Sequence, residues 1–322
     1  MNFRTDLALE AREILPGDPP GVAMRRDMRG DVHITRVEVL DETGERALGK
    51  PCGRYITLES ARFWQHDGDE LAALGEAIAQ EIAAVLPAMP DDKPVLVVGL
   101  GNRAITADAL GPQVAERVLV TRALRPEQRQ GRFRPVCAFA PGVLGVTGIE
   151  TFEAVSGLVR QVAPCMVIAV DALAARQTQR ILSTVQIADT GISPGSGLGK
   201  RNAGLSRESL GVPVLAVGVP MVVYAATISW DTMQALLDAL RTPSLPEEAN
   251  PSALATLLGA LDEGELEALV REVTQQAVGD LVVAPKEIDE ALRRVATAIA
   301  LGINIALHPG IAPEDMIAMQ SP

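Results

Sequence analysis

Two aspartates, Asp108 and Asp171, are the residues of this sequence whose type and position best suit chemistry. Asp108 lies in the glycine-framed segment GLGNRAITADALGP (99–112), and Asp171 lies in VIAVDALAAR (167–176). Each comes just beyond an apolar run that predicts a buried parallel strand, and open α/β sheets build their sites at such strand ends. Two carboxylates that meet there can share one proton and activate a water molecule. Taken singly, each aspartate could equally be a capping or turn residue.

The elements that would position these aspartates follow a strand-then-helix rhythm. Continuous apolar runs predict strands at 95–99, 136–140, 166–170 and 214–219, with a further candidate at 181–187. Helical spacing of apolar residues predicts helices at 69–86, 112–124, 148–162, 227–240, 251–276 and 286–307. Such alternation predicts an α/β fold in which helices cover both faces of a mostly parallel, twisted sheet.

The N-terminal part has a different pattern. Residues 31–58 alternate apolar and polar side chains, which predicts antiparallel strands joined by a turn at 41–45. We therefore expect an antiparallel extension of the parallel sheet. A short strand is also predicted at 280–284.

Composition excludes several classes of function. The 322 residues are 48% hydrophobic, enough for a large core. A net charge of -12 argues against direct binding to nucleic-acid phosphates, which requires clustered Lys and Arg. The N-terminus lacks the apolar segment of a signal peptide, and no uncharged apolar stretch reaches the ~18 residues of a membrane span. We expect a soluble, intracellular protein without a membrane partner.

Two glycine motifs suggest other functions. GLGNRA (99–104) fits the G-x-G-x-x-A pattern of a dinucleotide-binding module, but the next helix is expected only near Pro112. GISPG (191–195) fits the nucleophile elbow of a serine hydrolase, with Ser193 as nucleophile and His308 as base. Pro194 lacks the N–H that an oxyanion hole needs at that point, so a loop is the preferred interpretation.

Metal chemistry is not favoured by the sequence. The three histidines, at 33, 66 and 308, form no H-E-x-x-H motif, which excludes a histidine-rich zinc protease. A site made of carboxylates alone stays open. We expect neither a metal nor a cofactor.

Seven segments, taken in order, resemble one known family. They are RTDLALEA (4–11), GKPCGRYITLE (49–59), GLGNRAITADALGP (99–112), APGVLGVTGIET (140–151), DALAARQTQRI (171–181), DTGISPGSGLGKRN (189–202) and GVPVLAVGVPMVV (211–223). Together they resemble the germination proteases of endospore-forming bacteria. These peptidases degrade small acid-soluble spore proteins, so the resemblance implies those proteins as substrates and the spore cytoplasm as location.

The resemblance also implies a fold and a site. The family is related to the hydrogenase-maturation proteases, which place an acidic residue in a GxGN loop and an aspartate at a later strand end. Asp108 and Asp171 match those positions. Because the sequence has no histidine between 67 and 307, an aspartic-type mechanism fits better than a metal site. Which aspartate is ionised stays open, because coupled carboxylates titrate as a pair.

Further residues are assigned smaller roles. Asn102 and Thr106 could position the two aspartates or the oxyanion. The glycine-rich loop 189–205 is a candidate for substrate contact, through Ser193, Gly195, Ser196 and Gly197.

Finally, the resemblance implies a zymogen that removes its own N-terminal segment. It places the cut between Asp6 and Leu7, which makes residues 1–6 a pro-segment and residues 7–322 a single α/β peptidase domain. The acidic–aliphatic–Ala pattern there looks like the acidic–Ile/Phe–Ala pattern that the family cleaves in its substrates. The family is tetrameric, so we expect a homotetramer.

Overall fold

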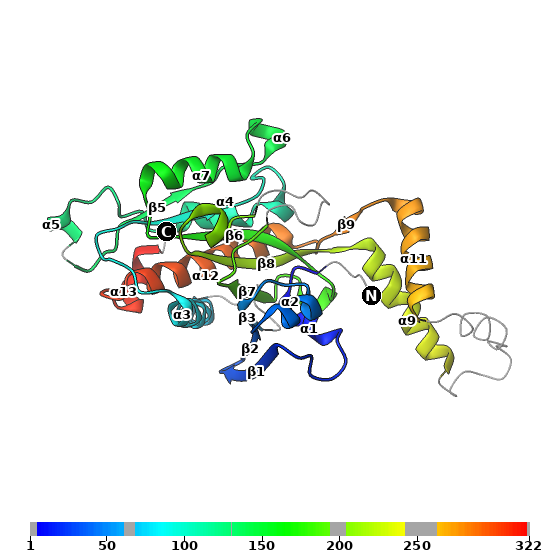
Figure 1. Cartoon of the computed structure of the whole chain (residues 1–322). Coiled ribbons are helices and arrows are strands. Elements are labelled where there is room, and N and C mark those ends of the chain that lie inside the picture. Colours follow the sequence, from blue (N-terminus) through cyan, green and yellow to red (C-terminus); the bar gives the residue numbers. More distant parts are fainter. Residues whose placement is uncertain (1–4, 61–67, 130, 194–203, 242–262, 321–322) are drawn as a thin grey trace.

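A computed structural model describes residues 5–60, 68–129, 131–193, 204–241 and 263–320 of the chain. Its strands form one mixed sheet in the order β1-β2-β3-β7-β8-β6-β4-β5, with β9 beside β8 (Figure 1). The strands are β1 (Val22–Arg29), β2 (Val32–Val39), β3 (Gly53–Glu59), β4 (Val95–Gly99), β5 (Val136–Phe139), β6 (Met166–Ala175), β7 (Thr184–Ala188), β8 (Val214–Tyr224) and β9 (Val282–Val283). This open α/β sheet confirms the fold class predicted from the sequence.

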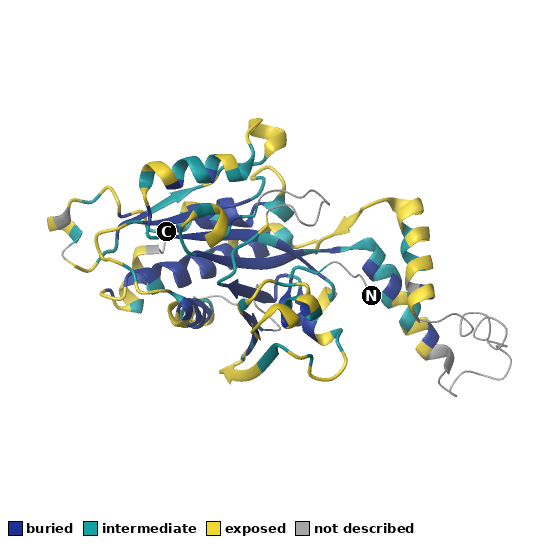
Figure 2. Ribbon diagram, in the orientation of Figure 1, coloured by how far each residue is buried: buried dark blue, intermediate teal, exposed yellow. Residues whose placement is uncertain are grey.

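The parallel core of the sheet is formed by β5, β4, β6 and β8. Every residue of β4 is buried, because helices cover both faces (Figure 2). Alternate residues of β4 face opposite ways. Val95 and Val97 pack in the cluster that contains α3 (Gly68–Val85), α4 (Leu110–Arg117) and α12 (Ile288–Leu307). Leu96 and Val98 face α7 (Thr151–Val162).

The antiparallel extension joins the parallel core through β7, which pairs antiparallel with both β3 and β8. Two short helices, α1 (Ala8–Glu13) and α2 (Glu42–Leu48), pack beside it. The turn predicted at 41–45 is wrong, because α2 starts there. Asp41 caps the helix by accepting hydrogen bonds from the N–H groups of Thr43 and Gly44, and Gly49 ends it in the left-handed conformation.

The strand that carries Asp171 is longer than predicted. Pairing between β4 and β6 ends at Gly99 and Val170, but β6 continues beside β8 as far as Ala175. Asp171 therefore lies inside β6 and not beyond it, opposite Gly218. It still occupies the position where the parallel pairing with β4 stops, which is the edge expected for a site.

The remaining helices lie around this sheet. They are η2 (Thr106–Asp108), α5 (Pro126–Arg129), α6 (Leu144–Thr147), η3 (Thr178–Arg180), α8 (Arg207–Leu210), α9 (Ala225–Arg241), α11 (Glu263–Val278) and α13 (Pro313–Gln320). The helix predicted at 112–124 begins and ends earlier, as α4. Helices α9 and α11 pack on each other through Trp230, Leu237 and Leu266, beyond the end of β8 (Figure 1). Within the described residues, every helix is too short or too polar to span a membrane.

Candidate active site

The loop after β4 holds Asp108 next to β6. The N–H of Leu100 donates to the carbonyl oxygen of Val170, 2.8 Å away, which fixes the start of the loop on β6. Gly101 has a φ of 109°, and a Cβ there would lie 2.0 Å from the carbonyl oxygen of Asp108. Asn102 then donates its N–H to Asp108 Oδ2 at 2.8 Å. Only a glycine at position 101 allows the chain to fold back this closely.

Asp171 is buried, with 8% of its surface exposed. Burial raises its pKa well above the usual range, and the charges of Asp108 and Asp6 raise it further. The N–H of Ala172, which donates to Asp171 Oδ1 at 2.9 Å, opposes this rise. Burial also raises the pKa of Asp108, against the hydrogen bond from Asn102. The structure thus brings the two predicted aspartates together, close enough for one charge to act on the other.

The two residues predicted to support the aspartates act in different places. Asn102 contacts Asp108 through its backbone, while its side-chain Oδ1 accepts the N–H of Ala104 at 3.0 Å. Thr106 donates its hydroxyl to Asp289 Oδ1 at 2.8 Å, in the first turn of α12. Its single hydroxyl hydrogen therefore ties η2 to α12 and is not directed at the aspartates.

The serine-hydrolase alternative gains no support from the positions of its residues. Ser193 is exposed. His308 is fully buried at the end of α12, where Nδ1 accepts the N–H of Arg134 at 3.2 Å and the ring packs edge-on against Phe133. Burial, and the charge of Arg134, lower the pKa of His308 to about 4. These contacts are those of a neutral core histidine. Gly195, Ser196 and Gly197 lie outside the described residues.

Comparison with known proteins identifies the family. The sequence profile of the germination proteases matches residues 10–242 and 238–320. The germination protease of Caldanaerobacter subterraneus is 46% identical, over 98% of this chain and 97% of its own length. The chain belongs to the germination protease family. Germination proteases of Clostridium perfringens (41% identical; 98% of each chain) and Bacillus velezensis (39%; 97% of this chain, 95% of its own) also match.

A solved structure shows a weaker likeness. A [NiFe] hydrogenase maturation protease from Thermococcus kodakarensis aligns with 44% of this chain and 80% of its own, at 20% identity and a TM-score of 0.30. The family assignment makes the protein a peptidase of spore germination and leaves its catalytic type to be argued from the site.

The dinucleotide alternative is disfavoured by the same loop that holds Asp108. In a dinucleotide site the backbone N–H groups after the strand face a pyrophosphate at the start of a helix. In this peptidase the N–H of Asn102 is used by Asp108, and α4 begins only at Leu110, after η2. Among the described residues, no three His, Cys, Asp or Glu side chains converge as metal ligands.

The predicted processing site lies beside β6 and brings in residues that the sequence did not suggest. The N–H of Asp6 donates to Ala174 O at 3.1 Å, and Leu7 is fully buried. The carbonyl oxygen of Asp6 accepts from Lys50 Nζ and Gln186 Nε2, both at 3.1 Å. One signal was available in the sequence, because Gln186 interrupts the apolar run of β7. Lys50 gave none, since it lies in a loop far along the chain.

Proposed function

We propose that this peptidase is an aspartic-type endopeptidase that starts the degradation of small acid-soluble spore proteins during germination. The observation that carries the proposal is that the loop after β4 holds Asp108 close to the buried Asp171. Burial raises the pKa of both carboxyls, and the charge of Asp108 raises that of Asp171 further. Two carboxyls that interact in this way can share one proton. Family membership supports the substrate class.

The environments of the two aspartates favour a division of roles. Asp171 is the more deeply buried and carries the additional repulsion from Asp108, so it is the protonated partner. Asp108 keeps the N–H of Asn102 and is the ionised partner. Asp108 takes a proton from water, which attacks the scissile carbonyl. Asp171 hydrogen-bonds that carbonyl and then gives its proton to the leaving nitrogen.

Three further properties belong to the same proposal. The chain is a zymogen that cuts itself between Asp6 and Leu7, and it needs no metal. It assembles as a homotetramer in the spore cytoplasm, so light scattering should give a mass four times that of one chain. The support for self-cleavage is that Asp6 is bound to Ala174 of β6, where its charge acts on Asp171. The support for the assembly is the family resemblance alone.

The decisive experiment uses the chain without residues 1–6, so that self-cleavage is not needed for activity. It compares this chain with its Asp108→Asn and Asp171→Asn variants on a purified small acid-soluble spore protein, with and without chelator. Each substitution should lower kcat by about 10²–10⁴-fold, the usual contribution of a positioned acid or base. Asp92→Asn, an exposed loop aspartate, is the matched control and should keep the parent rate.

Two outcomes would redirect the assignment. Near-normal turnover by either variant would remove the aspartate pair from the chemistry. Loss of activity with chelator in the parent would show a metal requirement. Ser193→Ala tests the serine-hydrolase alternative, and we expect it to keep turnover within a few-fold of the parent.

A further inference from the structure

Residue Asp6 is held against the strand that carries Asp171. Its N–H donates to Ala174 O at 3.1 Å, and the N–H of Ala174 donates back to Asp6 Oδ2 at 2.8 Å. Asp6 is thus bound through both its backbone and its carboxylate, three residues beyond Asp171.

The carbonyl oxygen of Asp6 receives two side-chain donors from different elements. Lys50 Nζ, from the loop between α2 and β3, and Gln186 Nε2, from β7, both lie 3.1 Å away. Gln186 also accepts the N–H of Ala8 through Oε1 at 2.7 Å. Its side-chain amide therefore hydrogen-bonds the backbone on both sides of Leu7, at Asp6 and at Ala8. Gln186 is itself buried, with 8% of its surface exposed.

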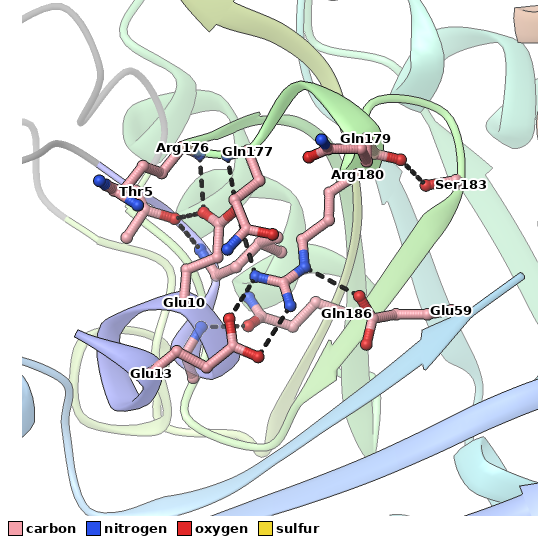
Figure 3. Close-up of polar contacts among 12 residues, drawn as sticks. Thr5, Glu10, Glu13, Glu59, Arg176, Gln177, Gln179, Arg180, Ser183 and Gln186 are labelled. Carbon is pink, nitrogen blue, oxygen red and sulfur yellow. Dashed lines mark hydrogen bonds and ion pairs between the residues drawn. The ribbon is translucent and has the colours of Figure 1, made fainter. Parts of the chain in front are cut away.

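The residues after Asp6 are fixed as firmly (Figure 3). Leu7 packs against Leu173 and Ala175 of β6. The carboxylate of Glu10 accepts the N–H groups of Arg176 at 2.7 Å and Gln177 at 2.8 Å. Thr5 links this frame to the peptide bond, because its hydroxyl donates to Glu10 and its Oγ1 accepts the N–H of Leu7. The Asp6–Leu7 peptide bond is therefore held by hydrogen bonds at both its C=O and its N–H.

We propose that Lys50, Gln186 and the N–H of Ala174 form the subsite for an acidic residue on the N-terminal side of the cleaved bond, which Asp6 of the same chain occupies here. The inference rests on the proposed function and names the residues that recognise its substrate. Lys50 has two tasks in this subsite. Its ammonium donates to the carbonyl oxygen at 3.1 Å. Burial lowers the pKa of Lys50, and the nearby Asp6 carboxylate opposes that effect by attracting the ammonium charge.

The same donors fit the chemistry of hydrolysis. When water adds to the carbonyl carbon and gives its proton to Asp108, the carbonyl electron pair moves onto the oxygen. Lys50 and Gln186 are placed to stabilise that negative charge, as an oxyanion hole does. The carbon–nitrogen bond then breaks, and the leaving amine takes the proton of Asp171.

A double-mutant cycle on self-cleavage tests the subsite in the full chain. Four chains are compared: the parent, Asp6→Asn, Lys50→Met and the double variant. Mass spectrometry follows the rate at which a new N-terminus appears at Leu7. Asn keeps an oxygen for the N–H of Ala174 but loses the charge that attracts Lys50. In the parent background Asp6→Asn should slow the cut by about 10- to 100-fold, because it removes the attraction between the Asp6 carboxylate and the Lys50 ammonium.

The interaction between the two substitutions decides the inference. With Met at position 50, Asp6→Asn should change the rate by no more than a few-fold, because the charge has lost its partner. If Asp6→Asn slows cleavage equally in both backgrounds, the proposed subsite is wrong. It is also wrong if the parent degrades the spore protein without being cut before Leu7. If Lys50→Met damaged the fold in general, it would slow self-cleavage equally in the chains with and without Asp6→Asn. The effect of Asp6→Asn on the rate would then be the same as in the parent background, which differs from the expected result.

Controls separate this inference from the function on which it rests. Lys50→Arg keeps the charge and the donors, and should keep the preference for Asp6. Lys286→Met removes an exposed lysine and should change nothing. Gln186→Glu keeps the acceptor for Ala8 but loses the donor to Asp6, and should slow cleavage by about 10²-fold or more. If the Asp171→Asn chain also cuts itself at the parent rate, the aspartate mechanism fails, whatever Lys50 does.

Discussion

At the scale of single residues, the site depends on a glycine as much as on its aspartates. A side chain at Gly101 would collide with the backbone of Asp108, which is 2.0 Å from the position of a Cβ. Gly101→Ala should therefore displace Asp108 and lower kcat by about 10²-fold, the cost of a misplacement near 1 Å. Steady-state kinetics on the spore protein, beside a thermal unfolding curve, measures both effects.

Gly148 provides a matched control for this prediction. It also has a positive φ, 71°, but a Cβ there would meet nothing within 4 Å. Gly148→Ala should lose about 1–2 kcal/mol of stability to the left-handed backbone, as Gly101→Ala does, and keep its activity. If both variants lose activity equally, the close approach of Gly101 to Asp108 is not what positions the carboxylate.

At the scale of elements, one buried arginine fastens α1 to the sheet. Arg180 forms two hydrogen bonds with Glu13, at 2.8 and 2.9 Å, and one with Glu59 of β3 at 2.8 Å. Its Nη1 also lies 3.4 Å from the buried Glu10 (Figure 3). Burial lowers the pKa of Arg180, but the carboxylates of Glu13 and Glu59 raise it by more. Helix α1 follows Asp6 directly, so this cluster also sets the position of the proposed processing site.

Removing that arginine should destabilise the fold strongly. Arg180→Met removes the cation that pairs with Glu13, Glu59 and the buried Glu10, and loss of one partner of a buried pair costs about 3–5 kcal/mol. Arg54→Met, which breaks a partly exposed pair with Asp189, should cost only about 0.2–1 kcal/mol. Urea unfolding of the two variants compares these losses. Similar losses for both would mean that the Arg180 cluster contributes no more than a surface ion pair.

The elements differ in how far the sequence could predict them. Strands β4, β6 and β8 were predictable because parallel strands that are buried on both faces have continuous apolar sequences. Helix α2 was not, because Gly44 within it is a poor helix former and its cap at Asp41 has the composition of a turn. Asp108 and Asp171 were predictable from strand ends. Lys50 was not, because only the tertiary fold brings it to Asp6. Gln186 left one sequence signal, a polar residue inside the apolar run of β7, but its contact with Asp6 also depends on the tertiary fold.

At the scale of the whole molecule, the site should make folding depend on pH. Burial and the charge of Asp108 hold the pKa of Asp171 well above its usual value of about 4. The folded chain therefore keeps a proton on this group at pH values where the unfolded chain has lost it. Stability falls as the pH rises wherever the folded state binds more protons. The charge of Asp171 therefore does not stabilise the folded state. The loss of folding stability caused by this group increases from about pH 4 up to its raised pKa.

Asp171→Asn should remove this cost and make the protein more stable as it removes activity. The free energy of unfolding of the variant minus that of the parent should be near zero below about pH 4. This difference should increase with pH until the raised pKa of Asp171 is passed. Guanidinium unfolding between pH 4 and pH 8 measures it, at one protein concentration because assembly also stabilises the folded state. The other carboxylates, which dominate a net charge of -12, titrate in both chains and cancel in the difference. Asp92→Asn should show no such pH dependence. A constant difference across the range would mean that Asp171 is not the partner that keeps the proton, and the roles of the two aspartates would have to be exchanged.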